Sequence, residues 1–139
     1  MAITQAMCTS FKQELMNEEH DLNTDTIKIA LYTSSATLSA ATTAYSATNE
    51  ISGTGYTAGG ATLTGGALSS SGTTAFADFD DASWTSASFT ANGAVIYNSS
   101  ASNKAIVVLA FGGDFTVTAG TFSVVFPAAD ASNAIIRLA

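Results

Sequence analysis

The chain has 139 residues, a net charge of −7 and only 11% charged residues, against roughly 25% in an ordinary soluble domain. Its 47% hydrophobic fraction argues against disorder, and the length fits a single domain over residues 1–139. The single cysteine, Cys8, excludes an internal disulfide. Four scattered basic residues predict no binding to nucleic acid or to an anionic membrane surface.

The first segment predicts a helix over residues 4–17. Thr4 is a candidate N-cap, and neither glycine nor proline interrupts the segment. Apolar residues recur every four positions and form one stripe, at Ile3, Met7, Phe11 and Leu15. Two placements of this stripe remain open. It covers the core of its own domain, or it docks on a neighbouring subunit.

A strand pattern begins after the polar connection at 17–25. Ile27, Ile29 and Leu31 alternate with less apolar residues, which predicts a half-buried strand. Short apolar segments then follow one another between turn residues and predict further strands at 61–68, 73–79, 84–90, 93–97, 104–111, 115–118, 121–126 and 133–138. The segment 104–111 is apolar on both faces, as in a central strand. Ala119-Gly120 predicts a tight hairpin turn.

One helix and a succession of short strands predict an all-β fold. We expect a single β-sandwich or jelly-roll-like domain over residues 26–139, preceded by the helix. The longest apolar run, 105–111, is too short to span a bilayer, and we find no secretory signal. The predicted core consists of residues from most of the strands, namely Ile29, Leu31, Phe76, Phe89, Ile96, Val108 and Val124.

Residues 33–60 form the least regular part of the chain. They are rich in Ser, Thr, Ala and Gly, and Tyr45 and Tyr56 are their large aromatic residues. A long irregular segment in a compact domain is often functional. Tyrosine suits an interface because it combines a large ring with a polar tip. We therefore predict Tyr45 and Tyr56 as partner contacts, together with Ile3, Met7 and Phe11 of the predicted helix.

The chain offers few groups for catalysis. His20 is the single histidine, and its acidic neighbours predict a solvated loop after the helix. Cys8 lies on the apolar stripe, where a buried thiol is a poor nucleophile. The glycine-rich stretch GTGYTAGG at 53–60 lacks the lysine of a phosphate-binding loop and predicts a turn. We expect no catalytic residues, no cofactor and no enzymatic activity.

The densest acidic cluster contains Asp78, Asp80 and Asp81, with Asp114 as a possible fourth member. Its spacing does not match a calcium-binding loop. We interpret it as a polar strand end. Calcium binding, a salt-bridging contact to another subunit and a pair of glycosidase carboxylates are the alternatives. We expect no metal site.

Four stretches resemble a family of short structural proteins from tailed bacteriophages. They are MAITQAMCTSFKQEL at 1–15, IKIALYTSSATL at 27–38, TNEISGTGYTAGG at 48–60 and VVFPAADASNAIIRLA at 124–139. The resemblance covers nearly the whole chain and implies a component of the virion, made in the host cytoplasm. It supplies no catalytic residues that could be transferred to this sequence.

Composition favours one place in the virion. A small, acidic domain rich in Ser, Thr and Ala suits a capsid decoration (cement) protein that binds the capsid exterior as a symmetric oligomer, a trimer or larger. Its expected partners are then the major capsid protein and further copies of itself. A tail, neck or fibre component, with tail proteins as partners, is the first alternative. A carbohydrate-binding module of a host-recognition device is the second.

Overall fold

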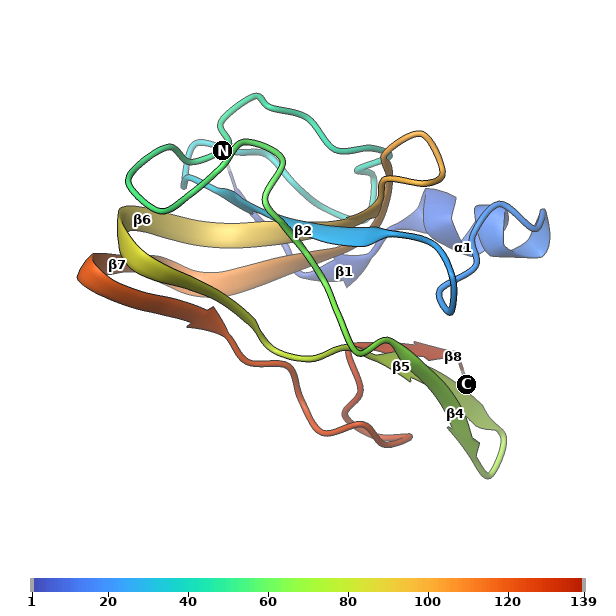
Figure 1. Cartoon of the computed structure of the whole chain (residues 1–139). Helices are drawn as coiled ribbons and strands as arrows, with labels where there is room; N and C mark the ends of the chain where they lie inside the picture. The colour runs from blue at the N-terminus through green and yellow to red at the C-terminus, as the bar shows by residue number, and fades with distance from the viewer. Residues whose placement is uncertain (1, 139) are drawn as a thin grey trace.

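The computed structural model describes residues 2–138 as two antiparallel sheets and one short helix (Figure 1). The larger sheet has the strand order β1-β7-β6-β2-β3, and the smaller sheet has the order β4-β5-β8. The all-β fold with a single helix is therefore confirmed. In chain order the elements are β1 (Ala6–Met7), α1 (Thr9–Met16), β2 (Ile27–Tyr32), β3 (Ala61–Thr62), β4 (Ala67–Ser71), β5 (Thr74–Asp78), β6 (Ala82–Asn98), β7 (Lys104–Val124) and β8 (Ile136–Leu138).

A long hairpin of β6 and β7 dominates the larger sheet (Figure 1). The two strands pair from Asn98 opposite Lys104 to Ala82 opposite Val124. The predicted turn at Ala119-Gly120 is wrong, because Gly120 pairs with Ala87 inside the hairpin. Ala119 has a φ of 47°, and the register shifts on both sides of Ala87. A β-bulge uses the same small residues and positive φ as a tight turn, so the local signal was ambiguous.

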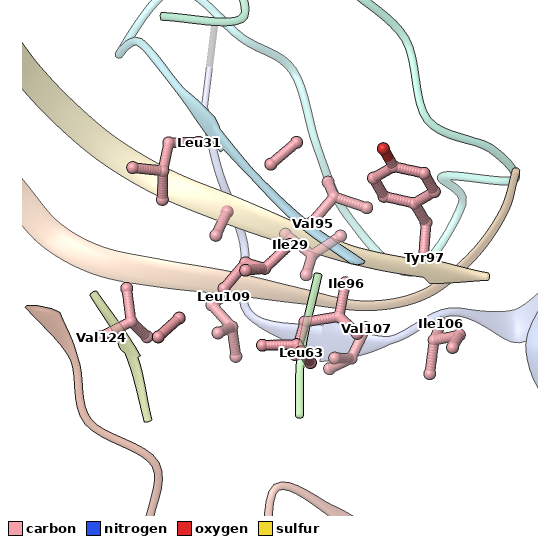
Figure 2. Packing of buried hydrophobic residues seen from close by; sticks show 14 of the residues in the cluster. Ile29, Leu31, Leu63, Val95, Ile96, Tyr97, Ile106, Val107, Leu109 and Val124 are labelled. Carbon is pink, nitrogen blue, oxygen red and sulfur yellow. The ribbon is translucent and has the colours of Figure 1, made fainter. Parts of the chain in front are cut away.

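Strand β2 lies inside the larger sheet, between β6 and β3. Its residues are buried on both faces, except for the half-buried Lys28. The predicted half-buried strand is therefore wrong. Figure 2 shows Val95 and Tyr97 on one side of the neighbouring strand β6 and Ile96 on the other. Residues 33–60 cover the first side, since Tyr97 stacks on Tyr45 from that segment.

The N-terminal segment differs from its prediction. The helix covers only Thr9–Met16, with Cys8 as its N-cap, so Thr4 does not cap it. Residues Ala6 and Met7 instead pair with the edge of β7, and the Cys8 N–H donates to the carbonyl of Ile106 (2.9 Å). An unpaired sheet edge presents N–H and C=O groups, and pairing with this edge competes with a helix over the same residues. The apolar stripe of the predicted helix is therefore wrong in its first half.

The predicted core is buried, with one exception. Phe76 is half-buried on β5 of the smaller sheet, while the other six residues lie in the core. Gly93 shows how closely this core is packed. A Cβ at this position would lie 2.8 Å from Ile3 Cδ1 and 2.7 Å from the Leu109 carbonyl oxygen. The glycine thus permits Ile3 to pack directly against the backbone of β6.

The smaller sheet projects from the body of the molecule (Figure 1). It contributes Ala77 and Ile136 to the core, but all five residues of β4 are exposed. Three strands of five residues or fewer have little apolar surface to bury between them. This sheet is therefore the least supported part of the fold.

Candidate functional site

The N-terminal candidates for partner contact have contacts within their own chain. Phe11 is fully buried and meets the His20 ring edge-on, at 4.9 Å between ring centroids. Ile3 and Met7 are half-buried against the core, and Ile3 bridges to Leu38. The helix thus completes the fold of its own domain, which was one of the two placements left open. A role of these residues in partner contact stays a prediction.

Tyr45 and Tyr56 meet at a single carboxylate. Tyr45 donates its hydroxyl hydrogen to Glu50 Oε1 (2.7 Å), and Tyr56 donates to Oε2 (2.6 Å). The Gly59 N–H also donates to Oε2 (2.8 Å). Tyr97 donates to the Gly59 carbonyl (2.6 Å) and stacks on Tyr45 at 4.8 Å. We call this group, Tyr45, Glu50, Tyr56, Gly59 and Tyr97, the Glu50 cluster.

The Glu50 cluster fastens the 33–60 segment to the larger sheet. The Tyr56 hydroxyl accepts a hydrogen bond from the Leu31 N–H of β2 (3.0 Å) while it donates to Glu50. On the same strand, Tyr32 donates to the Ser46 carbonyl (2.6 Å). A network with its donors and acceptors paired in this way holds one conformation. The segment predicted as an irregular excursion is thus held in place by polar contacts.

The cluster raises the pKa of its tyrosines above the ordinary value. Burial, together with a hydrogen bond to the Glu50 carboxylate, raises the pKa of Tyr45 to about 12. The same two causes, burial first, raise the pKa of Tyr56. A neutral phenol donates to a carboxylate, whereas a phenolate beside it would be repelled. Two of the predicted partner contacts are therefore also structural residues, and whether they contact a partner stays a prediction.

Sequence reasoning missed Glu50. Its signal was a lone carboxylate within a segment of 28 residues, 33–60, that carries no other charged residue and contains two tyrosines. A single carboxylate in such a neutral segment accepts hydrogen bonds, so nearby hydroxyl groups are its expected donors. The tyrosines at 45 and 56 were the available donors.

The side chain of His20 is buried, so its predicted place in a solvated loop is wrong. Its side chain is 0% exposed, and Nε2 lies 2.9 Å from Glu14 Oε1. Its Nδ1 lies 3.0 Å from the Asn98 Nδ2 atom. The connection after α1 folds back over the end of β6, and Asn98 also donates to Asp25 in this connection (2.7 Å). The polar sequence of this connection therefore gave no indication of its buried contact with the end of β6.

The hydrogen bonds determine the tautomer of His20. Asn98 Oδ1 accepts from the backbone N–H groups of Ser100 and Ala101, which fixes the orientation of the amide. Its Nδ2 must then donate to His20 Nδ1, and Nε2–H of the neutral ring donates to Glu14. The histidine thus bridges the helix to β6.

Cys8 is buried, as expected. Burial, and to a lesser degree the charge of Glu14, raise the pKa of its thiol to about 11.

The aspartates of the predicted acidic cluster do not converge. Asp81 accepts a hydrogen bond from the Phe126 N–H (2.8 Å), and Asp80 faces Thr64 (3.4 Å). Asp78 is half-buried on β5, while Asp114 accepts from Asn92 on the long hairpin (2.9 Å). Within residues 2–138, no three His, Cys, Asp or Glu side chains come together in a way that could hold a metal ion.

An apolar groove lies along β7, and the sequence did not predict it. The groove has a volume of about 520 Å³. Within residues 2–138, β1 pairs only with Val107 and Val108, so the outer edge of β7 beyond Leu109 has no strand beside it. We call this surface the β7 groove. Its main apolar residues are Leu109, Phe111, Phe115, Val117, Phe122, Val124, Phe126 and Ile135.

Comparisons with known proteins add no relative. No family model, no curated protein and no solved structure matches this chain. Among the residues that the structure describes, the one α-helix is too short and too polar to cross a membrane.

Proposed function

We propose that this chain is a non-enzymatic structural protein of a tailed-phage virion that decorates the capsid exterior as a symmetric oligomer. The observation that carries this proposal is the β7 groove beside an open strand edge. Such a surface suits contact with another protein, because the edge offers backbone hydrogen bonds and the groove accepts apolar side chains. The resemblance of four sequence stretches to phage proteins supports the virion as the setting.

The rest of the surface supports the same proposal. A chain with 11% charged residues leaves many small neutral groups at its surface, and these cost little to desolvate when subunits pack together. The 33–60 segment is held by the Glu50 cluster, so little conformational freedom would be lost on binding.

The test is the location and copy number of the chain in purified virions. Electron microscopy with a gold label on the chain, together with quantitative mass spectrometry, measures both. Decoration of the capsid predicts label over the whole capsid surface and many copies per particle. Label confined to the tail, neck or fibres would favour the first alternative. The absence of the chain from virions would contradict the proposal.

Carbohydrate binding has less support in the structure. A sugar-binding face usually offers exposed aromatic rings, but Trp84 is buried among Tyr56, Phe89 and Phe122. A glycan array with the purified chain tests this alternative directly.

A further inference from the structure

A second apolar groove lies between the connection after α1 and the smaller sheet (Figure 1). Its volume is about 530 Å³. Leu68 of β4 and Ile136 of β8 share one face of this sheet, since both pair with Ala77 of β5. Leu68 (54%) and Leu138 (46%) are strongly exposed there. We call this surface the β4 groove. Its main apolar residues are Leu15, Leu22, Leu68, Ile136 and Leu138.

The rim of the β4 groove is acidic. Glu18 and Asp21 line the groove, and both are exposed. They belong to the stretch 14–25, which holds five of the 11 acidic residues of the chain and no lysine or arginine. The other three acids of this stretch have partners within the chain, namely Glu14 with His20, Glu19 with Lys104 and Asp25 with Asn98. Within residues 2–138, Glu18 and Asp21 form no ion pair.

The basic residues of the chain do not line this groove. Within the part of the chain that the structure describes, its lining contains neither lysine nor arginine. Arg137 lies between Ile136 and Leu138 on β8, so its side chain points to the opposite face of the smaller sheet. There it lines a different pocket. The negative charge at the rim is therefore not balanced from within the chain.

The position of these two carboxylates is unfavourable for the isolated chain. Helix α1 ends at Met16, and the carbonyl groups at the C-terminal end of a helix already carry partial negative charge. Glu18 and Asp21 follow this end closely, and the last turn of α1 contains no basic residue. A local rule that is broken without a gain for the fold is expected at functional sites. A positively charged partner would relieve this repulsion.

Charge and apolar surface together select the occupant of the β4 groove. An acidic rim beside an apolar floor is complementary to a segment that carries lysine or arginine next to apolar side chains. A second copy of this chain has a net charge of −7 and is repelled by the first. Nucleic acids and anionic membrane surfaces are repelled for the same reason.

We propose that the β4 groove binds a basic, amphipathic segment of another protein. Its apolar side chains lie against Leu68, Ile136 and Leu138, and its lysine or arginine side chains pair with Glu18 and Asp21. The inference rests on the role in protein contact within the proposed function and adds the chemistry of one partner. The β4 groove and the β7 groove have no lining residue in common, so the two surfaces can be tested separately.

Binding of short fluorescent peptides to the full-length chain tests this proposal. Leucine and lysine alternate in the first peptide. Serine replaces leucine in the second, and glutamate replaces lysine in the third. We expect the fluorescence anisotropy of the first peptide to rise as the protein is added at physiological salt, and that of the other two to rise much less. The second peptide reports attraction to the net charge alone.

Two charge variants locate the lysine contacts. Glu18→Gln combined with Asp21→Asn removes both charges from the rim. It should weaken the binding of the first peptide about tenfold, as expected for the loss of two exposed ion pairs. Asp114→Asn combined with Asp130→Asn is the matched control, since it removes the same charge outside the groove. It should change the affinity much less.

Two apolar variants locate the leucine contacts. Leu68→Ser should weaken the binding of the first peptide and leave that of the second unchanged. Phe115→Ser is the matched control, because Phe115 (53%) is as exposed as Leu68 (54%) but lies at the β7 groove. It should not affect either peptide. Circular dichroism confirms that each variant is folded.

Each other outcome overturns the proposal. No binding of the first peptide would refute it. Equal affinity for the first two peptides, or equal weakening by the two charge variants, would assign binding to net charge. Weakening by Phe115→Ser in place of Leu68→Ser would assign it to the β7 groove. A dimeric mass by light scattering that Leu68→Ser returns to a monomer would show a second copy in the groove.

These measurements are made on the isolated chain. None of their results affects the labelling of virions, so failure of the inference remains distinguishable from failure of the proposed function.

Discussion

The two halves of the β6–β7 hairpin are built from one pair of strands but differ in burial. In the half near the connection at 99–103, the residues at 93–98 and 105–109 are buried on both faces. In the far half, residues of β6 alternate between buried and exposed, and β7 from Phe115 to Ser123 is exposed or half-buried throughout. The difference follows from what covers each half.

The near half is covered by other segments of the chain. The 33–60 segment lies over one face, β2 pairs with β6, and β1 pairs with β7. The same segment also reaches the far half of β6, where Thr54 pairs with Ser88, but β1 and β2 do not. The far half of β7 pairs with β6 on one side, but its outer edge has no strand beside it among the described residues. Strand β7 therefore belongs to the closed core at one end and forms an available surface at the other. This division separates the residues that determine stability from those that are free to contact a partner.

Alanine in the near half tests the comparison most severely. Ile96 and Val108 are fully buried on the central strands. Ile96→Ala or Val108→Ala should lower the free energy of unfolding by about 2–4 kcal/mol, because a cavity in a rigid core is not refilled. Urea denaturation followed by circular dichroism measures the loss. Val117→Ala in the far half is the matched control and should cost clearly less, since Val117 is half-buried. Equal losses would contradict the division of the hairpin.

Removal of one hydroxyl from the Glu50 cluster tests the cover of the near half. Tyr56→Phe leaves the Leu31 N–H and one Glu50 oxygen without this partner. We expect a loss of about 1–3 kcal/mol, the usual cost of unpaired buried polar groups. Tyr45→Phe removes only the hydrogen bond to Glu50 Oε1 and leaves no backbone N–H without its partner, so it should cost less than about 1 kcal/mol. A larger effect at Tyr45 than at Tyr56 in urea titrations would refute this ranking.

Alkaline pH should loosen the same cover. An unfolded tyrosine titrates near pH 10, whereas burial and Glu50 raise the pKa of Tyr45 to about 12 and raise that of Tyr56 as well. Between these values the unfolded chain binds fewer protons than the folded chain, so stability falls as pH rises above about 10. Urea midpoints between pH 8 and 11 measure the slope. Tyr56→Phe should reduce it, and an unchanged slope in that variant would assign the effect to other groups.

The sequence predicted strands well where the cause was local. Alternation and apolar runs located β2, β5 and the near halves of β6 and β7, and most of the predicted core is buried. The errors arose where a distant segment decided the conformation. Ala6 and Met7 became a strand because the edge of β7 was available. The bulge at Ala119 looked like a turn, since nothing nearby revealed that β6 continues beside it.

The candidate site was less predictable than the fold. Tyr45 and Tyr56 were predicted as partner contacts, which stays a prediction, and the Glu50 carboxylate that joins them within the chain was missed. His20 was placed in solvent because its sequence neighbours are acidic, whereas Asn98, 78 residues away, holds it inside. The β7 groove depends on which edge is left without a partner. That is a property of strand order, which periodicity does not encode.

The smallest expected effect concerns the far half of the hairpin. Phe115 is 53% exposed, so Phe115→Ser should change the free energy of unfolding of the isolated chain by less than about 0.5 kcal/mol, as for most surface substitutions. Phe122→Ser is the matched control, since Phe122 packs against Trp84 and Phe89, and it should cost more. Urea titration at low protein concentration separates folding from association. An equal loss of unfolding free energy at Phe115 and at Phe122 would contradict the comparison. It would mean that the exposed Phe115 ring stabilises the fold and is not simply a free surface residue.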